Sequence, residues 1–551
     1  MPDIPITPLD TLRAAVAEAV ARAAGGPQER VADTMTLERP KRAEFGDYST
    51  NAALLLAPGA GRNPRELAQE IGDELAGLLG EQLGSVDVAG PGFVNLSLAD
   101  GWLRAALAGV LEAGGRFGAG AADPVELVNV EFISANPTGP MHVGHARNAA
   151  YGDALARMLE FEGHRVEREF YVNDAGTQIA RFGASLKAAA SGLPVPEDGY
   201  HGDYIPELAG QIPGAAQMDE TELGRAAVAL MITAFEQTLA DFAVLPFDHW
   251  SYESALHDGS PSPVDDALEL LAQQGRTYER DGALWLRTTE FGDDKDRVLV
   301  RSSGEHTYFA SDIAYHEAKR ARGFERQIDI WGADHHGYLG RMRAAFAALG
   351  GDPTKLEMLI MQLVHLVSSG ERSQMSKRAG EFVTVEELVE MVGVDAARWF
   401  LLARSHETPV ELDVELARQQ SSENPVYYVQ YAHARIASLL DRIGEVEVRA
   451  ATEPEAWAGG EPLHPSERLL VMSLLAFPGE FAEAMERRAV HRVASYALEL
   501  AQTFTAFYRD CRVIDAEPAP TRALRISLSL ATMRLLERCL WMLGVGAPRQ
   551  M

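Results

Sequence analysis

The segment VELVNVEFISANPTGPMHVGHARN, residues 125–148, constrains the fold more than any other stretch of the chain. Its first half is an apolar run rich in β-branched residues, which predicts a buried strand. The run Asn136-Pro137-Thr138-Gly139-Pro140 then excludes both strand and helix, and from Ala150 onward apolar residues recur at helical spacing. The pattern predicts a strand, a tight turn and a helix, and the strand, turn and helix that follow it continue the alternation typical of a parallel sheet.

Two histidines and a glycine lie where this turn meets the helix: His142, Gly144 and His145. The N–H groups of a helix's first turn have no partner inside the helix and the helix dipole is positive there, so such a start suits a polyphosphate. Gly144 has no Cβ, which lets the backbone approach a flat ring such as adenine. The alternative is that both histidines are surface or helix-cap residues, and the four-residue motif alone does not decide.

The residues around this motif carry a family resemblance. The string EFISANPTGPMHVGHARN contains a motif that resembles the HIGH signature of class I aminoacyl-tRNA synthetases, and as a whole it is similar to arginyl-tRNA synthetases in particular. Met375-Ser376-Lys377 resembles the second class I signature, KMSKS, with Gln374 in place of its first lysine. The resemblance implies that His142, His145 and Lys377 are catalytic, and that Lys377 alone supplies the mobile cation of this loop.

The resemblance also implies an ATP site. In doubly wound sheets ligands bind beside the loops that follow the strands, which is where 332–337 is expected, and an Asp in such a loop can accept both hydroxyls of a ribose. ATP is expected to enter with Mg²⁺, and no zinc is expected. The implied ATP-binding residues are His142, Gly144, His145, Gly332, Asp334, Met375, Ser376 and Lys377.

The side chain of arginine ends in a planar guanidinium with five hydrogen-bond donors, so a pocket that binds it is expected to contain carboxylates. Two acids stand where the sheet is expected to place that pocket, Glu131 and Asp312, although a strand-end surface charge and a helix N-cap are the simpler interpretations. The resemblance implies that Glu131 and Asn136 bind the α-amino group of arginine, and that Tyr308 and Asp312 bind its guanidinium. Which of the two acids binds which end of the substrate stays open. The full implied set, in which His335 or His336 completes the guanidinium end, is Glu131, Ser134, Asn136, His142, Tyr308, Asp312, His335 and His336.

Two groups of residues are expected to contact tRNA. Phe93 and Asn95 alternate on one face of the strand GFVNLSL, and an aromatic ring beside an amide suits an unpaired base. The resemblance implies an N-terminal domain that touches the tRNA D-loop and a C-terminal anticodon-binding domain. The residues implied in the latter are Tyr427, Tyr428, Tyr431 and Arg435. The alternatives are an ordinary sheet edge and a solvated helix face over core aromatics.

The fold class expected is α/β: a Rossmann-like parallel-sheet catalytic domain with an N-terminal α+β domain and a C-terminal α-helical bundle. An insertion interrupts the alternation of strands and helices in the middle domain, and helical patterns dominate the last third. The expected bounds are 1–115 for the N-terminal domain, 116–384 for the catalytic domain with an insertion near 190–300 and strands resuming at 307–316 and 358–367, and 385–551 for the bundle.

Composition limits the class of the protein. Its 551 residues suffice for several domains. We find no run of about eighteen apolar residues and no signal peptide, so a cytoplasmic protein without membrane contact is expected. Cys511 and Cys539 are too few for a disulfide framework or a structural zinc site. The formal net charge of −30 argues at face value against an RNA partner, but affinity for RNA depends on local basic faces.

Three functions compete at this point. The first is an arginine–tRNA ligase, with tRNA(Arg), L-arginine and ATP as partners and a monomer as its expected state. The second is a small-substrate nucleotidyltransferase with the same HxGH motif, against which the helical C-terminal third and the Met-Ser-Lys loop speak. The third is a non-catalytic tRNA-binding paralogue, which would be expected to lack His142, His145 or Lys377, and all three are present. Among synthetases, a class I lysine enzyme is the nearest rival.

Overall fold

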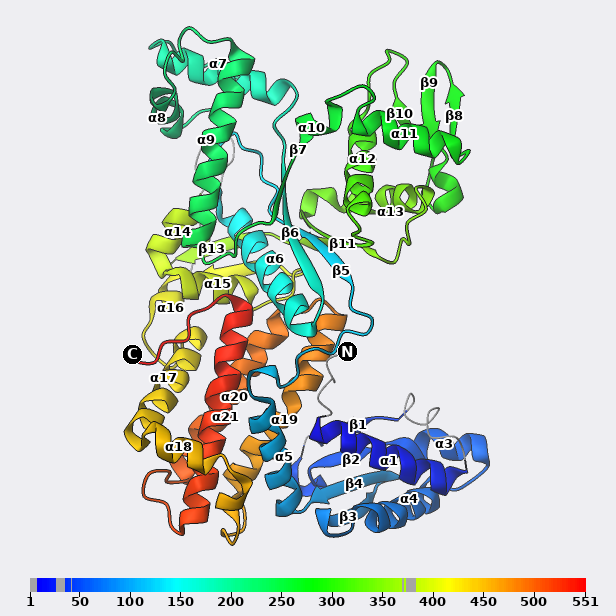
Figure 1. Ribbon diagram of the computed structural model, residues 1–551, viewed down its shortest axis with the longest axis vertical. Helices are drawn as coiled ribbons and strands as arrows, with labels where there is room; N and C mark the ends of the chain where they lie inside the picture. The colour runs from blue at the N-terminus through cyan, green and yellow to red at the C-terminus, as the bar shows by residue number, and fades with distance from the viewer. Residues whose placement is uncertain (1–6, 26–34, 41, 369–370, 373–382) are drawn as a thin grey trace.

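The computed structural model describes residues 7–25, 35–40, 42–368, 371–372 and 383–551. A parallel sheet occupies the middle of the molecule, with two lobes at one end of it and a bundle of long helices at the other (Figure 1). A small domain, blue in Figure 1, lies beside the bundle. The expected fold class is thereby confirmed.

The N-terminal α+β domain has an antiparallel sheet in the order β1-β2-β4-β3. Apolar residues at helical spacing in α1 and α4, among them Val16 and Ile71, are buried in its core. Its elements are α1 (Pro8–Ala24), β1 (Leu37–Glu38), β2 (Tyr48–Thr50), α3 (Ala52–Ala60), α4 (Pro64–Leu79), β3 (Leu83–Ala89), β4 (Phe93–Leu98) and α5 (Asp100–Ala113).

The catalytic domain is built on a five-stranded sheet in the order β12-β11-β5-β6-β7, with all neighbours parallel. The chain starts at β5, adds β6 and β7 on one side, and then adds β11 and β12 on the other. The strand order therefore reverses between β5 and β11, and such a switch point is where doubly wound sheets bind ligands. The strands are β5 (Leu127–Glu131), β6 (Arg165–Val172), β7 (His249–Tyr252), β11 (Arg326–Gly332) and β12 (Leu356–Met361).

Two lobes interrupt this sheet. The first, between β6 and β7, is helical, and the second, between β7 and β11, carries an antiparallel sheet in the order β10-β9-β8 (Figure 1). The first lobe contains α7 (Thr177–Ala190), α8 (Tyr204–Gln211) and α9 (Glu220–Asp241), and the second contains α10 (Glu253–His257), α11 (Pro263–Gln273), β8 (Thr277–Arg280), β9 (Ala283–Leu286), β10 (Arg297–Val300) and α12 (Tyr308–Ala321). Two further helices connect strands of the central sheet: α6 (Val143–Glu162) between β5 and β6, and α13 (Leu339–Ala348) between β11 and β12.

Two strand predictions were wrong. Residues 307–316 begin α12, because the Thr307 side chain accepts the N–H of Ala310 as an N-cap and the apolar residues that follow recur at helical spacing. Residues 358–367 form parts of two strands: β12 ends at Met361, and β13 (Val364–Ser368) belongs to another sheet with β14 (Glu371–Arg372) and β15 (Val410–Asp413). That last strand is also an exception to the helical structure expected after residue 385.

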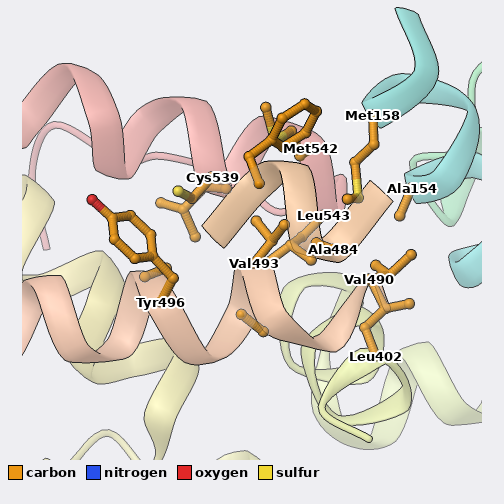
Figure 2. Packing of buried hydrophobic residues seen from close by; sticks show 14 of the residues in the cluster. Ala154, Met158, Leu402, Ala484, Val490, Val493, Tyr496, Cys539, Met542 and Leu543 are labelled. Carbon is orange, nitrogen blue, oxygen red and sulfur yellow. The ribbon is translucent and has the colours of Figure 1, made fainter. Parts of the chain in front are cut away.

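The helices after residue 384 form two groups. Those on the catalytic side are α14 (Val385–Val392), α15 (Val394–Leu402) and α16 (Val414–Arg418). The bundle proper consists of α17 (Pro425–Ile443), α18 (Glu445–Ala451), α19 (Pro465–Glu486), α20 (His491–Asp510) and α21 (Ala519–Leu543). Figure 2 shows where the groups meet: Val490, Met158 of α6, Leu402 of α15 and Met542 of α21 belong to one cluster of buried side chains. The catalytic helix and the bundle thus share one apolar core.

Candidate active site

The turn after β5 is strained. Ile133 and Ser134 have φ angles of 72° and 43°, a region that β-branched residues avoid at a cost of about 1–3 kcal/mol. Asn148 of α6 holds this turn, because its side chain accepts the N–H of Ile133 (2.8 Å) and donates to the carbonyl of Ile330 in β11 (3.1 Å). Asn148 therefore joins both strands of the switch point to α6. It was missed from the sequence because nothing in its position sets it apart from other helical residues.

His142 and His145 form the start of α6. His142 is the N-cap: its Nδ1 accepts the N–H of Gly144 (3.1 Å), while Nδ1 of His145 accepts the N–H of His142 (3.2 Å). The rings stack with centroids 3.7 Å apart. Because both Nδ1 atoms accept, each ring carries its proton on Nε2, which is therefore a donor. The cap interpretation and the catalytic one are thus compatible, since the cap fixes the direction of both donors.

Gly144 is required by close packing. A Cβ there would lie 2.9 Å from Cε1 of His142, so a larger residue would displace the ring of the N-cap. The absence of a side chain also leaves the first turn of the helix accessible, as the sequence suggested.

A second segment is joined to this helix start by backbone hydrogen bonds. The N–H of Val143 donates to Val383 (3.0 Å) and the N–H of Val385 donates to Met141 (3.0 Å), so residues 383–385 run antiparallel to the histidine motif. Residues 375–377, and with them the predicted Met375, Ser376 and Lys377, lie outside the described residues. The end of the loop that bears them is nevertheless fixed beside His142.

The loop after β11 lies across the switch point from the histidines. Gly332 ends β11, and a short 3₁₀ helix, Ala333–Tyr338, follows it. His335 lies on the exposed side of this loop with its ring centroid 5.6 Å from that of Trp331. The side chains of Asp334 and His336 are outside what the structure describes.

Glu131 is a buried acid at the carboxyl end of β5 and is 6% exposed, which rules out the strand-end surface charge. Oε1 accepts the hydroxyl of Ser134 (2.8 Å), and Oε2 accepts Nζ of Lys319 (2.7 Å). Ser134 in turn accepts the N–H of Tyr171 (3.1 Å), so the strained turn and β6 together fix the carboxylate. Burial raises the pKa of Glu131, and Lys319 opposes that rise.

Asp312 lies one turn into α12 and is not its N-cap, which is Thr307. Its Oδ2 accepts the hydroxyl of Tyr338. Burial raises the pKa of Asp312, and the hydrogen bond from Tyr338 partly offsets this. Two other predicted pocket residues lie on the surface: Tyr308, the first residue of α12, is 71% exposed, and Asn136 in the turn after β5 is also exposed.

Four residues near this site were not predicted from the sequence. Lys319, Asp329 and His316 form a buried network with Glu131, and Tyr338 binds Asp312. Charged residues on a helix are usually solvent-exposed, so only the register between α12 and the sheet, which the sequence does not provide, shows that they are buried.

The predicted tRNA contacts fall at two places. Tyr427, Tyr428, Tyr431 and Arg435 line one cavity of about 350 Å³ between α17 and α20. In this cavity the guanidinium of Arg435 lies 5.7 Å from the ring centroid of Tyr431 and 4.6 Å from that of Tyr508. On β4 of the N-terminal domain, Phe93 is 41% exposed whereas Asn95 is buried. A base stacked on Phe93 would meet the Asn95 side chain only if the local surface rearranged.

In the part of the chain that the structure describes, no three His, Cys, Asp or Glu side chains are grouped so that they could hold a metal ion. Among the same residues, no helix has the length and hydropathy needed to cross a bilayer.

Comparisons with known proteins agree along the whole chain. Family models match residues 10–98 (arginyl tRNA synthetase N terminal domain), 108–192 and 229–419 (tRNA synthetases class I (R), catalytic domain) and 429–551 (DALR anticodon binding domain). A curated "Arginine--tRNA ligase" of Frankia alni is 46% identical over 557 residues, covering 98% of this chain and 99% of the relative.

Solved structures give the same result. The arginyl-tRNA synthetase of Thermus thermophilus superposes with a TM-score of 0.76 at 27% identity, covering 98% of this chain and 100% of that one. The arginyl-tRNA synthetase of Plasmodium falciparum shares the fold, with a TM-score of 0.74 at 18% identity and 98% of each chain covered. The resemblance drawn from the histidine motif is confirmed: the chain belongs to the arginyl-tRNA synthetase family of class I aminoacyl-tRNA synthetases.

Proposed function

We propose that this chain ligates L-arginine to tRNA(Arg) at the cost of one ATP, through an arginyl-adenylate. One observation carries the proposal: two oriented imidazole donors and two acids lie at one switch point of the sheet. The imidazoles belong to the N-terminus of α6, one acid is Glu131 at the end of β5, and the other is Asp312 in α12. The family membership of all three matched parts supports it. A nucleotidyltransferase for a small substrate has no use for the DALR bundle, and a non-catalytic paralogue has no use for the oriented histidines.

In the activation step the carboxylate of arginine attacks the α-phosphorus of ATP, and pyrophosphate leaves. Negative charge builds on phosphate oxygens, so catalysis depends on placement and positive potential. We assign His142 and His145 to those oxygens, since their Nε2 protons and the N-terminus of α6 are donors. Gly144, Gly332 and Asp334 are proposed to hold the nucleoside. Mg²⁺, if it takes part, is proposed to arrive on the phosphates, and no step is derived through it.

Lys377 is proposed to bring a positive charge to the leaving phosphates, with Met375 and Ser376 beside it. Its position in the chain supports this. Lys377 precedes Thr384, which bridges to His142, by seven residues, and a chain of that length reaches at most about 25 Å. A cation on such a loop can approach the triphosphate as the reaction proceeds.

For the amino acid we propose that Glu131, with Ser134 and Asn136, receives the α-amino group. Asp312 is proposed to receive the guanidinium, with Tyr308, His142 and His335 or His336 around the substrate. The burial of Glu131 and the half-buried position of Asp312 support this, because a carboxylate partly kept from water binds a cation more strongly than an exposed one. Lysine cannot offer the same bidentate fork, so discrimination requires no separate editing domain.

The second half-reaction transfers arginine from the adenylate to a hydroxyl of the tRNA's terminal adenosine, releasing AMP. We propose that Tyr427, Tyr428, Tyr431 and Arg435 bind bases of the anticodon loop in their cavity and that Phe93 and Asn95 contact the D-loop. Rings beside an arginine suit unpaired bases. We further propose a cytoplasmic monomer, whose catalytic part extends to about residue 419, where the catalytic family match ends.

The direct test is ATP–pyrophosphate exchange with each of the twenty amino acids, with and without tRNA(Arg). Exchange is expected with arginine only, and only when tRNA is present, as is usual in the family. Exchange driven equally well by lysine would overturn the assignment of the pocket. Exchange without any amino-acid preference would overturn the proposed function itself.

A further inference from the structure

Three carboxylates form a row across the catalytic sheet. Asp329 of β11 pairs in register with Glu131 of β5, and Glu131 pairs in register with Glu169 of β6. The exposed fractions of these residues are 0%, 6% and 0%. Three negative charges on adjacent strands, kept from water, repel one another and require compensation.

The compensation comes from one side of α12. Three basic residues at intervals of three, His316, Lys319 and Arg322, reach the acidic row. Nε2 of His316 lies 2.8 Å from Oδ2 of Asp329, and Arg322, just after the helix, donates to Glu169. Helix and sheet therefore meet through three cations against three carboxylates.

Lys319 occupies the centre of this arrangement and is fully buried. Its Nζ donates to Oε2 of Glu131 (2.7 Å) and to Oδ1 of Asp329 (2.9 Å) and lies 4.3 Å from the ring centre of Tyr315. Together with the hydroxyl of Ser134, it uses two of the roughly four acceptor sites of the Glu131 carboxylate. The hydroxyl of Tyr315 also faces this carboxylate, and the acceptor capacity that is left suits one further donor such as an ammonium group.

The row is separate from Asp312. His316 has oxygen acceptors at both ring nitrogens, the carbonyl of Asp312 at Nδ1 (2.7 Å) and Asp329 at Nε2, so it carries both protons. Burial lowers the pKa of His316, but Asp329 outweighs it and the net shift is upward. Within the described residues, no lysine or arginine forms an ion pair with the carboxylate of Asp312, whose partner is Tyr338.

We propose that Lys319 is a positioning residue for arginine recognition: it fixes the Glu131 carboxylate toward the substrate's α-amino group and balances the acidic row, so that Asp312, with the buried Glu253 near it, is left for the guanidinium. This rests on the function proposed above. It also predicts that Asp329 and Glu169 contribute little to binding of the arginine side chain, because both carboxylates are already paired with cations of the protein.

The test uses three variants and exchange kinetics with tRNA present. Lys319→Met removes the cation, and Lys319→Arg keeps one. The double variant, Lys319→Met with Asp329→Asn, removes Lys319 together with one negative charge of the row, so that the charges stay balanced and the fold is preserved. Lys355→Met is the matched control, because Lys355 pairs with Glu126 at the opposite end of the sheet.

In the doubly substituted enzyme, the KM for arginine is expected to rise about tenfold to a hundredfold, while the KM for ATP stays near that of the wild type. The KM for arginine is also expected to fall as pH rises, because the loss of the nearest cation raises the pKa of Glu131 further and only its ionised form attracts the ammonium group. The titratable groups then facing it are Glu169, Tyr171 and Tyr315, while His316 and Arg322 lie at the two ends of the row. Lys319→Arg should recover part of the loss.

A wild-type KM for arginine in the doubly substituted enzyme would overturn the proposal. So would an equal rise in the KM for arginine and for ATP without any pH dependence, which is the result of a purely structural role. If the wild-type enzyme shows no exchange with arginine at all, the proposed function itself is wrong. That result is distinguishable from the two outcomes above, which both require an active wild-type enzyme.

Discussion

Arg398 and Asp153 form an ion pair 2.6 Å long between two side chains with no exposed surface. The pair joins α15 to α6, the helix that begins with the two histidines. Arg398 also donates to the carbonyls of Leu543 (2.9 Å) and Phe242 (3.1 Å), so α6 is linked to the end of α21 in the bundle as well. The orientation of the catalytic helix and the position of the bundle are therefore fixed by the same buried contacts.

Replacing Arg398 should therefore destabilise the protein strongly. Arg398→Met leaves the buried Asp153 carboxylate with Arg157 and the N–H of Leu245 as partners, and losing one member of a buried ion pair costs about 3–5 kcal/mol. The free energy of unfolding in urea measures this. Arg442→Met is the control, because Arg442 is exposed on α17. Equal losses for the two variants would show that the pair contributes no more than a surface residue.

His145→Ala should slow activation while leaving arginine binding intact. Removing one preorganised donor to a developing phosphate charge costs about 2–4 kcal/mol in kcat. Pyrophosphate exchange at saturating arginine measures the loss. His164→Ala, at the opposite end of α6, is a suitable control. A rise in the KM for arginine as large as the fall in kcat would place His145 in the amino-acid pocket instead.

The pH dependence of arginine binding should report on Asp312. Burial raises the pKa of its carboxyl, and only the ionised form attracts a guanidinium, so the KM for arginine should increase as pH falls through that pKa. Tyr338→Phe removes the hydrogen bond that lowers the pKa, so the increase should then begin at a higher pH. KM values for arginine and ATP across pH measure this. A transition that stays in place in Tyr338→Phe would contradict the role of Asp312.

Local pattern was sufficient to predict the centre of this site. The strand, turn and helix of residues 125–148 are encoded by neighbours in the sequence, as are the turn-forming prolines and the helix start at His142. The strand predicted at 307–316 was wrong because Tyr308 and Phe309 favour strands on their own, whereas the cap at Thr307 and burial against the sheet favour a helix.

The charge network could not be predicted, because its contacts depend on register. Asp329 and Glu131 are neighbours on adjacent strands, and Lys319 reaches both from a helix that the sequence offered only as an alternative to a strand. In the sequence each looks like an ordinary exposed charge. The same holds for Asn95, whose alternation with Phe93 was visible but whose burial follows from packing within the N-terminal domain.

The N-terminal domain is attached to the bundle by Arg468 of α19. Its guanidinium binds Asp47 and Asp100, both in that domain, and also the carbonyl of Leu98. Arg468→Ala should loosen the domain and raise the KM for tRNA about tenfold, because charge-assisted contacts that place the proposed tRNA-contacting surface are lost. Aminoacylation kinetics measure this, with Arg22→Ala, which breaks ion pairs within the N-terminal domain, as the control. An unchanged KM for tRNA would show that the domain does not need this contact.

Arg435 lies between two rings in a cavity where every other large group is aromatic or neutral: Tyr427, Tyr428, Tyr431, Phe504 and Tyr508 line it with Arg435 as the single cation. A base entering this cavity can stack on a ring and a phosphate can meet the guanidinium, so Arg435→Ala should weaken binding of tRNA(Arg) about tenfold or more. Filter binding of an isolated anticodon stem-loop separates this from effects elsewhere. Arg442→Ala, on the same helix but outside the cavity, should leave that binding near the wild-type value. If the two variants weaken binding equally, Arg435 contributes only a nonspecific attraction between charges.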